Sequence, residues 1–193
     1  MMEYIFTLKY RLPEDETDVD TLVERLGEAG CTDALIGTGT PGRLGLEFSR
    51  EAETAQEALR SALADVKSVI DGAVLVEAGP DFVGLSDIAD YMGMTRQNMR
   101  KLMVAHRDFP LPVHEGSAAF WHLADVLTWL EARKGYRLNQ GLLETATATL
   151  EVNAVKESRR HSVREARELE RLIAECQVCR AHPFQGPIVA GGT

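Results

Sequence analysis

The segment LSDIADYMGMTRQNMRKLMVAHRDFP, which runs from Leu85 to Pro110, contains two short helix patterns separated by a glycine. In the first pattern Ile88 and Met92 lie four residues apart on one helical face, and Ser86 stands where an N-cap is expected. Gly93 ends this helix, because glycine adopts a left-handed conformation at little cost. The spacing predicts two helices joined by a tight turn, which is a helix–turn–helix.

The second helix is predicted to begin after Thr95, whose hydroxyl can cap its first turn. Met99 and Leu102 then lie on the inward face, with Met103 and His106 beside them. In the first helix, a small residue, Ala89, stands where the two helices must cross closely. The remaining side chains of the second helix are expected to face outward: Thr95, Arg96, Gln97, Arg100, Lys101 and Val104.

Charge sets this segment apart from the rest of the chain. The 193 residues carry 21 Lys and Arg against 30 Asp and Glu, a net charge of −9. All of this excess lies in residues 1–80, which have 7 basic and 16 acidic side chains. From Tyr91 to Arg107, by contrast, there are four basic residues and no acidic one. Because DNA phosphates attract Lys and Arg and repel carboxylates, this window predicts a DNA-binding face.

The residues that follow predict a short β-hairpin, or wing, and a third helix. We expect wing strands at Leu111–His114 and Ala119–His122, around the turn EGSA, with His122 on the outer face. Trp121 is expected in the core rather than on the surface. The helix from Leu123 onward is predicted to point four apolar side chains inward, namely Val126, Leu127, Trp129 and Leu130.

Four predicted features therefore follow one another along the chain: a helix–turn–helix, a Phe-Pro-x-Pro run, a wing that ends in Trp, and a helix with the pattern Asp-Val-x-x-Trp-Leu. The residues that carry this pattern are Leu85, Ile88, Ala89, Gly93, Thr95, Arg96, Phe109, Pro110, Pro112, Trp121, Asp125, Val126, Trp129 and Leu130. The pattern resembles the winged helix–turn–helix proteins of the AlpA/excisionase type, relatives of the MerR superfamily. Members of that family are DNA-binding transcription regulators or recombination directionality factors. The resemblance covers only about residues 83–134, and Ala119 and Phe120 stand where many relatives carry an arginine.

Eight residues are the candidates for contact with DNA. Arg96 and Gln97, near the start of the second helix, can make paired hydrogen bonds to guanine and adenine edges. Arg100 and Lys101 lie further along the helix and can neutralise phosphates. The wing supplies the last two members of the full set, which is Thr95, Arg96, Gln97, Arg100, Lys101, Arg107, His114 and Ser117.

Residues 1–80 are predicted to form a separate α+β domain. Strand and helix patterns follow one another in the order βαββαβ, which is typical of the ferredoxin-like sandwich. Gly37, Gly39 and Gly42 spell the GxGxxG pattern of dinucleotide-binding loops, but Pro41 interrupts it and the strand pattern RLGLEF follows in place of a helix. We interpret this loop as a hairpin turn, and the domain as a dimerisation or sensing module.

Residues 136–180 are predicted to form helices that pair two subunits, and residues 181–193 a flexible tail. Cys176, Cys179 and His182 resemble part of a metal site, but a fourth ligand would have to come from elsewhere. We therefore expect no metal and no cofactor.

Several classes of protein do not fit the composition. The N-terminus lacks the pattern of a signal peptide, and no segment has the roughly 20 apolar residues of a membrane helix. Three cysteines argue against a disulfide framework, so we expect a cytoplasmic protein. No residue pattern resembles a catalytic nucleophile or a calcium loop, so we expect no enzymatic activity.

The sequence therefore predicts an α+β protein with a ferredoxin-like domain (1–80), a winged helix–turn–helix (81–135) and C-terminal helices (136–180). We expect a homodimeric transcription regulator that reads a palindromic site in double-stranded DNA with the helix at 95–106. Two alternatives stay open. In one, the protein is an antitoxin, or binds another protein partner, and represses its own operon. In the other, residues 1–80 sense a small molecule.

Overall fold

Four antiparallel strands form the larger sheet of the protein. The computed structural model describes residues 1–16, 18–133, 135–136, 138–160 and 169–174. The strands lie in the order β2-β3-β1-β4, and each neighbouring pair is antiparallel. Their bounds are Met2–Arg11 for β1, Ala34–Gly37 for β2, Arg43–Ala52 for β3 and Val74–Gly79 for β4. Together with the helices, they make the chain the mixed α+β protein that the sequence predicts.

One face of this sheet forms the first hydrophobic core. Successive side chains of a strand point to opposite faces, so alternate apolar residues gather on one side. In β1 these are Tyr4, Phe6, Leu8 and Tyr10, all buried. Phe6 lies opposite Phe48 of β3, and the two rings stack with centroids 5.1 Å apart.

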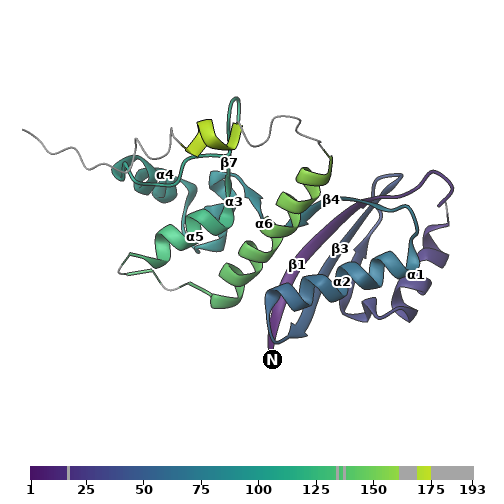
Figure 1. Cartoon of the computed structure of the whole chain (residues 1–193). Coiled ribbons are helices and arrows are strands. Elements are labelled where there is room, and N and C mark those ends of the chain that lie inside the picture. Colours follow the sequence, from purple (N-terminus) through teal and green to yellow (C-terminus); the bar gives the residue numbers. More distant parts are fainter. Residues whose placement is uncertain (17, 134, 137, 161–168, 175–193) are drawn as a thin grey trace, which may run out of the picture. The chain divides into compact units, whose positions relative to one another are not determined.

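Two helices, α1 (Val19–Glu28) and α2 (Ala55–Val69), lie on the same side of the sheet (Figure 1). Each begins at a side-chain cap: the Asp18 carboxylate accepts from the Thr21 backbone N–H, and the Thr54 hydroxyl accepts from that of Glu57. Leu22 and Leu26 of α1 are buried. Val23 is 38% exposed, because it is rotated about 100° from Leu22 around the helix.

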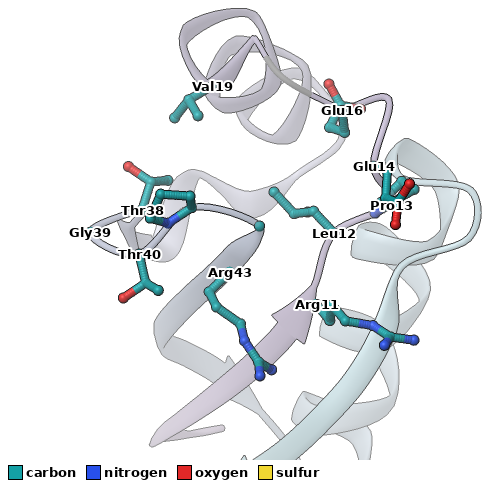
Figure 2. A pocket seen from close by; sticks show the side chains of 12 residues that line it. Arg11, Leu12, Pro13, Glu14, Glu16, Val19, Thr38, Gly39, Thr40 and Arg43 are labelled. Carbon is teal, nitrogen blue, oxygen red and sulfur yellow. The ribbon is translucent and has the colours of Figure 1, made fainter.

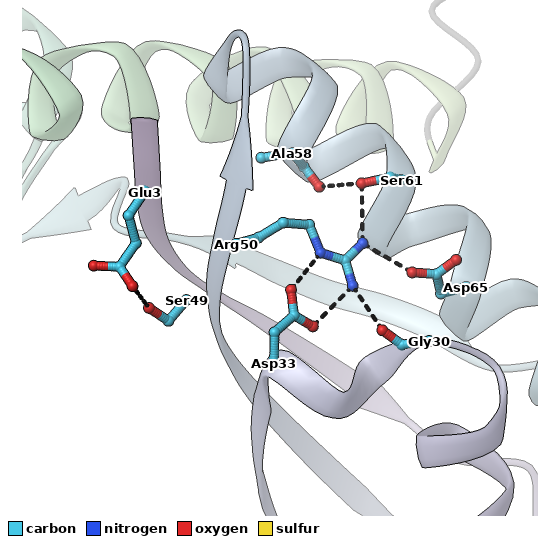
Figure 3. A network of polar contacts seen from close by, with 8 residues as sticks. All are labelled: Glu3, Gly30, Asp33, Ser49, Arg50, Ala58, Ser61 and Asp65. Carbon is cyan, nitrogen blue, oxygen red and sulfur yellow. Dashed lines mark hydrogen bonds and ion pairs between the residues drawn. The ribbon is translucent and has the colours of Figure 1, made fainter. Parts of the chain in front are cut away.

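A buried arginine lies beneath these helices (Figure 3). Arg50 of β3 makes a bidentate contact with Asp33, at 2.7 and 3.0 Å, and a 2.8 Å contact with Asp65. Asp33 belongs to a short 3-10 helix, η1 (Cys31–Asp33), and Asp65 to α2. The Ser61 hydroxyl and the Gly30 carbonyl accept the remaining hydrogen bonds. Five contacts thus hold β3, η1 and α2 together, and no sequence pattern indicated them.

The second hydrophobic core is built mainly from residues 82–131. Its elements are β5 (Phe82–Val83), α3 (Leu85–Tyr91), α4 (Arg96–Ala105), β6 (His114–Glu115), β7 (Ala119–His122) and α5 (Leu123–Glu131). The three strands form a small sheet in the order β5-β7-β6. The apolar side chains of α5 predicted to face inward are all buried: Val126, Leu127, Trp129 and Leu130.

The long helix α6 (Gln140–Arg160) contributes to both cores. Ala148 and Val152 pack against the first, whereas Ala146 and Leu150 pack against the second. As a result, the segments 1–80 and 81–135 lie in one compact unit, Met1–Glu157. The buried face of α6 also carries polar residues at four-residue spacing, namely Thr145, Thr149 and Asn153.

The second unit begins at Ser158. In its described part, residues 169–174 are helical, and Leu169, Leu172 and Ile173 are exposed. The rest of the predicted C-terminal helix and the tail lie outside the described residues, as do Cys176, Cys179 and His182. In the described ranges, no helix has the length and apolar character required to span a membrane.

Candidate nucleic-acid interface

Helices α3 and α4 are joined by a tight turn centred on Gly93. Gly93 has φ +62°, a left-handed conformation that favours glycine, and its N–H donates to the Asp90 carbonyl. The Met94 N–H then donates to the Ala89 carbonyl at 2.9 Å. The Thr95 hydroxyl caps α4 by accepting from the Asn98 N–H at 3.2 Å, as predicted.

The predicted cap of α3 is wrong. The helix begins at Leu85, so Gly84 is the N-cap and Ser86 lies exposed in the first turn. The Asp87 carboxylate reaches back to accept the Gly84 N–H at 2.7 Å. In a capping box, the acidic side chain three positions after the N-cap accepts the N–H of the N-cap residue itself. Asp87 has this role at the start of α3.

The inward faces of α3 and α4 hold the two helices together. Ile88, Ala89 and Met99 are at most 1% exposed. Met92, Met94, Leu102 and Met103 are partly buried around them. The small side chain of Ala89 is buried at this junction, in agreement with the sequence prediction.

The outward face of α4 is exposed and basic. Thr95, Arg96, Gln97, Arg100 and Lys101 are all exposed, and so is Arg107 just beyond the helix. In the part of the chain that the structure describes, no carboxylate lies within ion-pair distance of these four basic groups. Val104 is the apolar exception on this face. The guanidinium, amide and ammonium groups are therefore open to a ligand.

The nearest acid in sequence, Asp108, is bound by another side chain. Arg133 hydrogen-bonds its carboxylate and lies over the Trp129 ring, 3.4 Å from the centroid. The hydrogen bond from Arg133 lowers the pKa of Asp108. The negative charge of Asp108 is therefore paired with Arg133, so it does not neutralise the positive charge of Arg107.

This pair predicts a pH-dependent contribution to stability. The pKa of Asp108 is lower in the folded chain than in the unfolded one, so the contribution is complete above about pH 5 and is lost as the pH falls below about 4. We expect Asp108→Asn to be less stable than the parent at pH 7 in urea unfolding, and the difference to shrink at pH 3. An equal difference at both pH values would contradict the pairing.

The wing is shorter than predicted. Its first strand, β6, is His114–Glu115 instead of Leu111–His114, and Leu111 is 69% exposed. Pro112 lacks an N–H, so ladder pairing can begin only with the Val113 N–H, which donates to the Phe120 carbonyl at 2.8 Å. His114 and Ser117 are exposed, and the His114 ring lies 6.4 Å from that of Phe120.

Aromatic packing holds the wing to α5. Trp121 and Trp129 are buried in the core, as predicted, and both rings meet Phe109 edge-to-face. The Trp121 Nε1–H donates to the Pro110 carbonyl at 3.0 Å. His106 packs edge-on against Trp129, with ring centroids 5.4 Å apart, in agreement with its predicted place beside the inward face.

A buried polar cluster joins Asp81 and His122 of β7 to α6, and the sequence analysis did not predict it. The Asp81 side chain is fully buried; its carboxylate lies 2.6 Å from His122 Nδ1 and accepts from Asn153 Nδ2 at 2.7 Å. His122 was predicted on the outer face of the wing but is partly buried by this contact. Asn153 also exchanges two hydrogen bonds with the backbone of Ala78, and the Thr149 hydroxyl donates to the Pro80 carbonyl. The polar stripe on α6 was the available signal.

The glycine-rich loop is a hairpin turn, as predicted. It joins β2 to β3, where Gly37 pairs with Gly45, and no helix follows it. A pocket of about 650 Å³ opens beside it, and Leu12 points into that pocket while Arg11 and Arg43 point away from the loop (Figure 2). The loop thus lacks the helix N-terminus that a dinucleotide pyrophosphate requires.

The described residues contain no group of three or more His, Cys, Asp or Glu that could hold a metal ion. Comparison of the chain with protein-family models, with curated proteins and with solved structures found no match.

Proposed function

We propose that the protein is a sequence-specific, DNA-binding transcription regulator, with the outward face of α4 as the reading surface. The observation that carries the proposal is the exposed row of Arg96, Gln97, Arg100 and Lys101, none of which has an ion-pair partner among the described residues. Arg and Gln near a helix start can read base edges, and the later basic groups can neutralise phosphates.

Two features of the fold support this proposal. The chain order of α3, α4, a short hairpin and α5 favours a winged helix–turn–helix, in which the second helix enters the major groove. The βαββαβ order with strands β2-β3-β1-β4 favours a ferredoxin-like domain for residues 1–80. A single small DNA-binding module buries little surface, so we propose a homodimer that reads a palindromic site.

Selection of bound fragments from genomic DNA tests the proposal and identifies the site in one step. Enrichment of one palindromic sequence is expected. Uniform recovery of fragments would contradict sequence-specific binding. The absence of any recovered fragment at low salt would contradict DNA binding altogether.

The two classes of basic side chain should separate in binding measurements. Arg96→Ala is expected to weaken binding to the selected site by about 1–3 kcal/mol, with little change on random DNA. Lys101→Ala should weaken both alike, because phosphates carry no sequence information. Arg60→Ala, on the exposed side of α2, is the matched control and should change neither. Equal losses on both DNAs for Arg96→Ala would contradict its assigned role.

One pocket favours a ligand-responsive regulator as a second candidate. A cavity of about 540 Å³, a size typical of small-molecule sites, is lined by Glu47 of β3, Tyr91 of α3 and Leu142 of α6 among others. Burial and the nearby Asp87 and Glu47 charges raise the pKa of Tyr91. A ligand there would touch the first helix of the helix–turn–helix directly. Stabilisation against heat by a small molecule, lost in Tyr91→Ala, would favour this candidate.

A further inference from the structure

The four-stranded sheet has an accessible surface at the end that carries the β2–β3 hairpin. The core and the helices α1 and α2 lie on the opposite face of the sheet (Figure 1). At the far end of the accessible face, α3 and α6 border a separate cavity that is lined by Glu3 and Glu47. At the hairpin end, by contrast, Arg11 of β1, Arg43 of β3 and Val74 of β4 are all exposed. A ligand can therefore reach the sheet at this end.

Two arginines lie directly opposite each other on this surface. Arg11 and Arg43 form a pair in the antiparallel register of β1 and β3, so their side chains leave the same face with Cβ atoms about 5 Å apart. Both extend away from the hairpin loop (Figure 2). Among the described residues, neither guanidinium has an ion-pair partner. Like charges at opposed positions destabilise a sheet, so this pair costs stability unless an anion lies between the two groups.

The unpaired arginines contrast with the charge of the domain that carries them. Residues 1–80 have 16 acidic and 7 basic side chains, and Lys9, Arg25 and Arg50 are each ion-paired with a carboxylate. The carboxylate of Glu77, on the neighbouring strand β4, is bound by Lys9 at 3.1 Å and does not serve the arginine pair. Arg11 and Arg43 are thus left for a negative charge from outside the chain.

A hollow with a bare floor lies beside Arg43. It has a volume of about 420 Å³, within the range of small-molecule sites, and Lys9 and Val76 also line it. Its floor is Gly37 and Gly45, which pair across β2 and β3. Neither glycine has a left-handed φ, and a Cβ at either would meet the opposite carbonyl oxygen at an ordinary 3.7 or 3.9 Å. The fold therefore tolerates side chains here, and glycine within a strand often marks the close approach of a ligand.

We propose that this hollow binds a small phosphate monoester, with the phosphate between Arg11 and Arg43 and the organic part over the Gly37–Gly45 floor. Guanidinium groups form paired hydrogen bonds with phosphate oxygens. A phosphate monoester carries a charge of about −1.5 to −2 at pH 7, which matches two arginines, whereas a carboxylate matches only one. The inference goes beyond the proposed function, because it assigns a ligand class to residues 1–80 and does not involve α4.

Isothermal titration calorimetry of the full chain at low salt tests the charge requirement. The probes are phenyl phosphate, inorganic phosphate and benzoate, which has a similar ring but a single charge. Phenyl phosphate is expected to bind about tenfold or more tightly than benzoate. Arg11→Gln and Arg43→Gln should each raise its dissociation constant about tenfold or more. Arg60→Gln, on the exposed side of α2, is the matched control and should have no effect.

Gly45→Val tests the floor separately from the arginines. Valine favours strands and its Cβ fits, so the fold should hold, but the side chain would occupy the hollow. The variant should bind phenyl phosphate about tenfold more weakly and inorganic phosphate within about threefold of the parent. Titration of the parent with phenyl phosphate should also shift the amide resonances of Gly37 and Gly45 in NMR spectra, which locates the ligand.

Four results would overturn the inference. They are no binding of phenyl phosphate at about 10 mM, equal binding of benzoate, glutamine variants that bind like the parent, and Gly45→Val that binds phenyl phosphate like the parent. If Arg43→Gln instead weakens DNA binding as much as Lys101→Ala while phenyl phosphate does not bind, the arginine pair contacts the DNA backbone and the inference is wrong. The titrations contain no DNA. Arginine-dependent phosphate binding by a chain that selects no DNA sequence would contradict the proposed function and support this site.

Discussion

Arg50→Ala is expected to lower the free energy of unfolding by about 3 kcal/mol. The Arg50 side chain is only 10% exposed, and its removal would leave Asp33 and Asp65 without their shared counter-ion. An unpaired charge below the surface costs about 3–5 kcal/mol, and the 27% and 28% exposure of the two carboxylates places the effect at the lower end of this range. Urea unfolding followed by circular dichroism gives the value.

Two further variants separate charge from packing at this position. Arg60→Ala removes an exposed arginine from α2 and should change stability by less than about 0.5 kcal/mol. Arg50→Met combined with Asp33→Asn and Asp65→Asn leaves no carboxylate unpaired and should recover part of the loss. If Arg50→Ala loses less than about 1 kcal/mol, the network contributes little and the expectation is wrong.

Asn153→Ala should cost about 2–4 kcal/mol. The Asn153 amide satisfies the Ala78 N–H, the Ala78 carbonyl and one oxygen of the buried Asp81 carboxylate. Each buried group that loses its partner costs about 1–3 kcal/mol, and more when it is charged. Asn98→Ala, on the exposed surface of α4, is the matched control and should be close to neutral.

Asn153→Asp tests the same cluster by charge. The substitution keeps the shape of the side chain but replaces the donor with an oxygen beside the Asp81 carboxylate, so like charges would meet in a buried site. We expect it to be at least as destabilising as the alanine variant at neutral pH. Hydrogen exchange at the Ala78 amide should accelerate in both variants. An aspartate variant as stable as the parent would contradict the assigned hydrogen bonds.

The packed faces of α3 and α4 and the turn between them could be predicted because their determinants are local. The spacing of Ile88, Ala89 and Met99 fixes the packed face, and Gly93 and Thr95 fix the turn through backbone conformation and capping. The same local rules placed the hairpin between β2 and β3. They were wrong at the start of α3, where Gly84 and not Ser86 is the N-cap and the Asp87 carboxylate accepts the Gly84 N–H.

The polar clusters could not be predicted, because their partners are far apart in sequence. The partners of Asp81 are His122, which is 41 positions away in the sequence, and Asn153, which is 72 positions away. Arg50 lies 17 positions from Asp33 and 15 positions from Asp65. Sequence periodicity identifies which face of an element is buried but does not show which polar group meets which. The structure shows that the candidate residues for DNA contact are exposed. Their binding to DNA stays a proposal.

The packing of α6 against both cores bears on how residues 81–135 can be produced as a fragment. A fragment cut after α5 would strip Ala146 and Leu150 from one core and Ala148 and Val152 from the other. It would also leave the Asp81 carboxylate without the Asn153 amide. We therefore expect a fragment that contains residues 81–135 to need α6 as well, as in the compact unit from Met1 through Glu157.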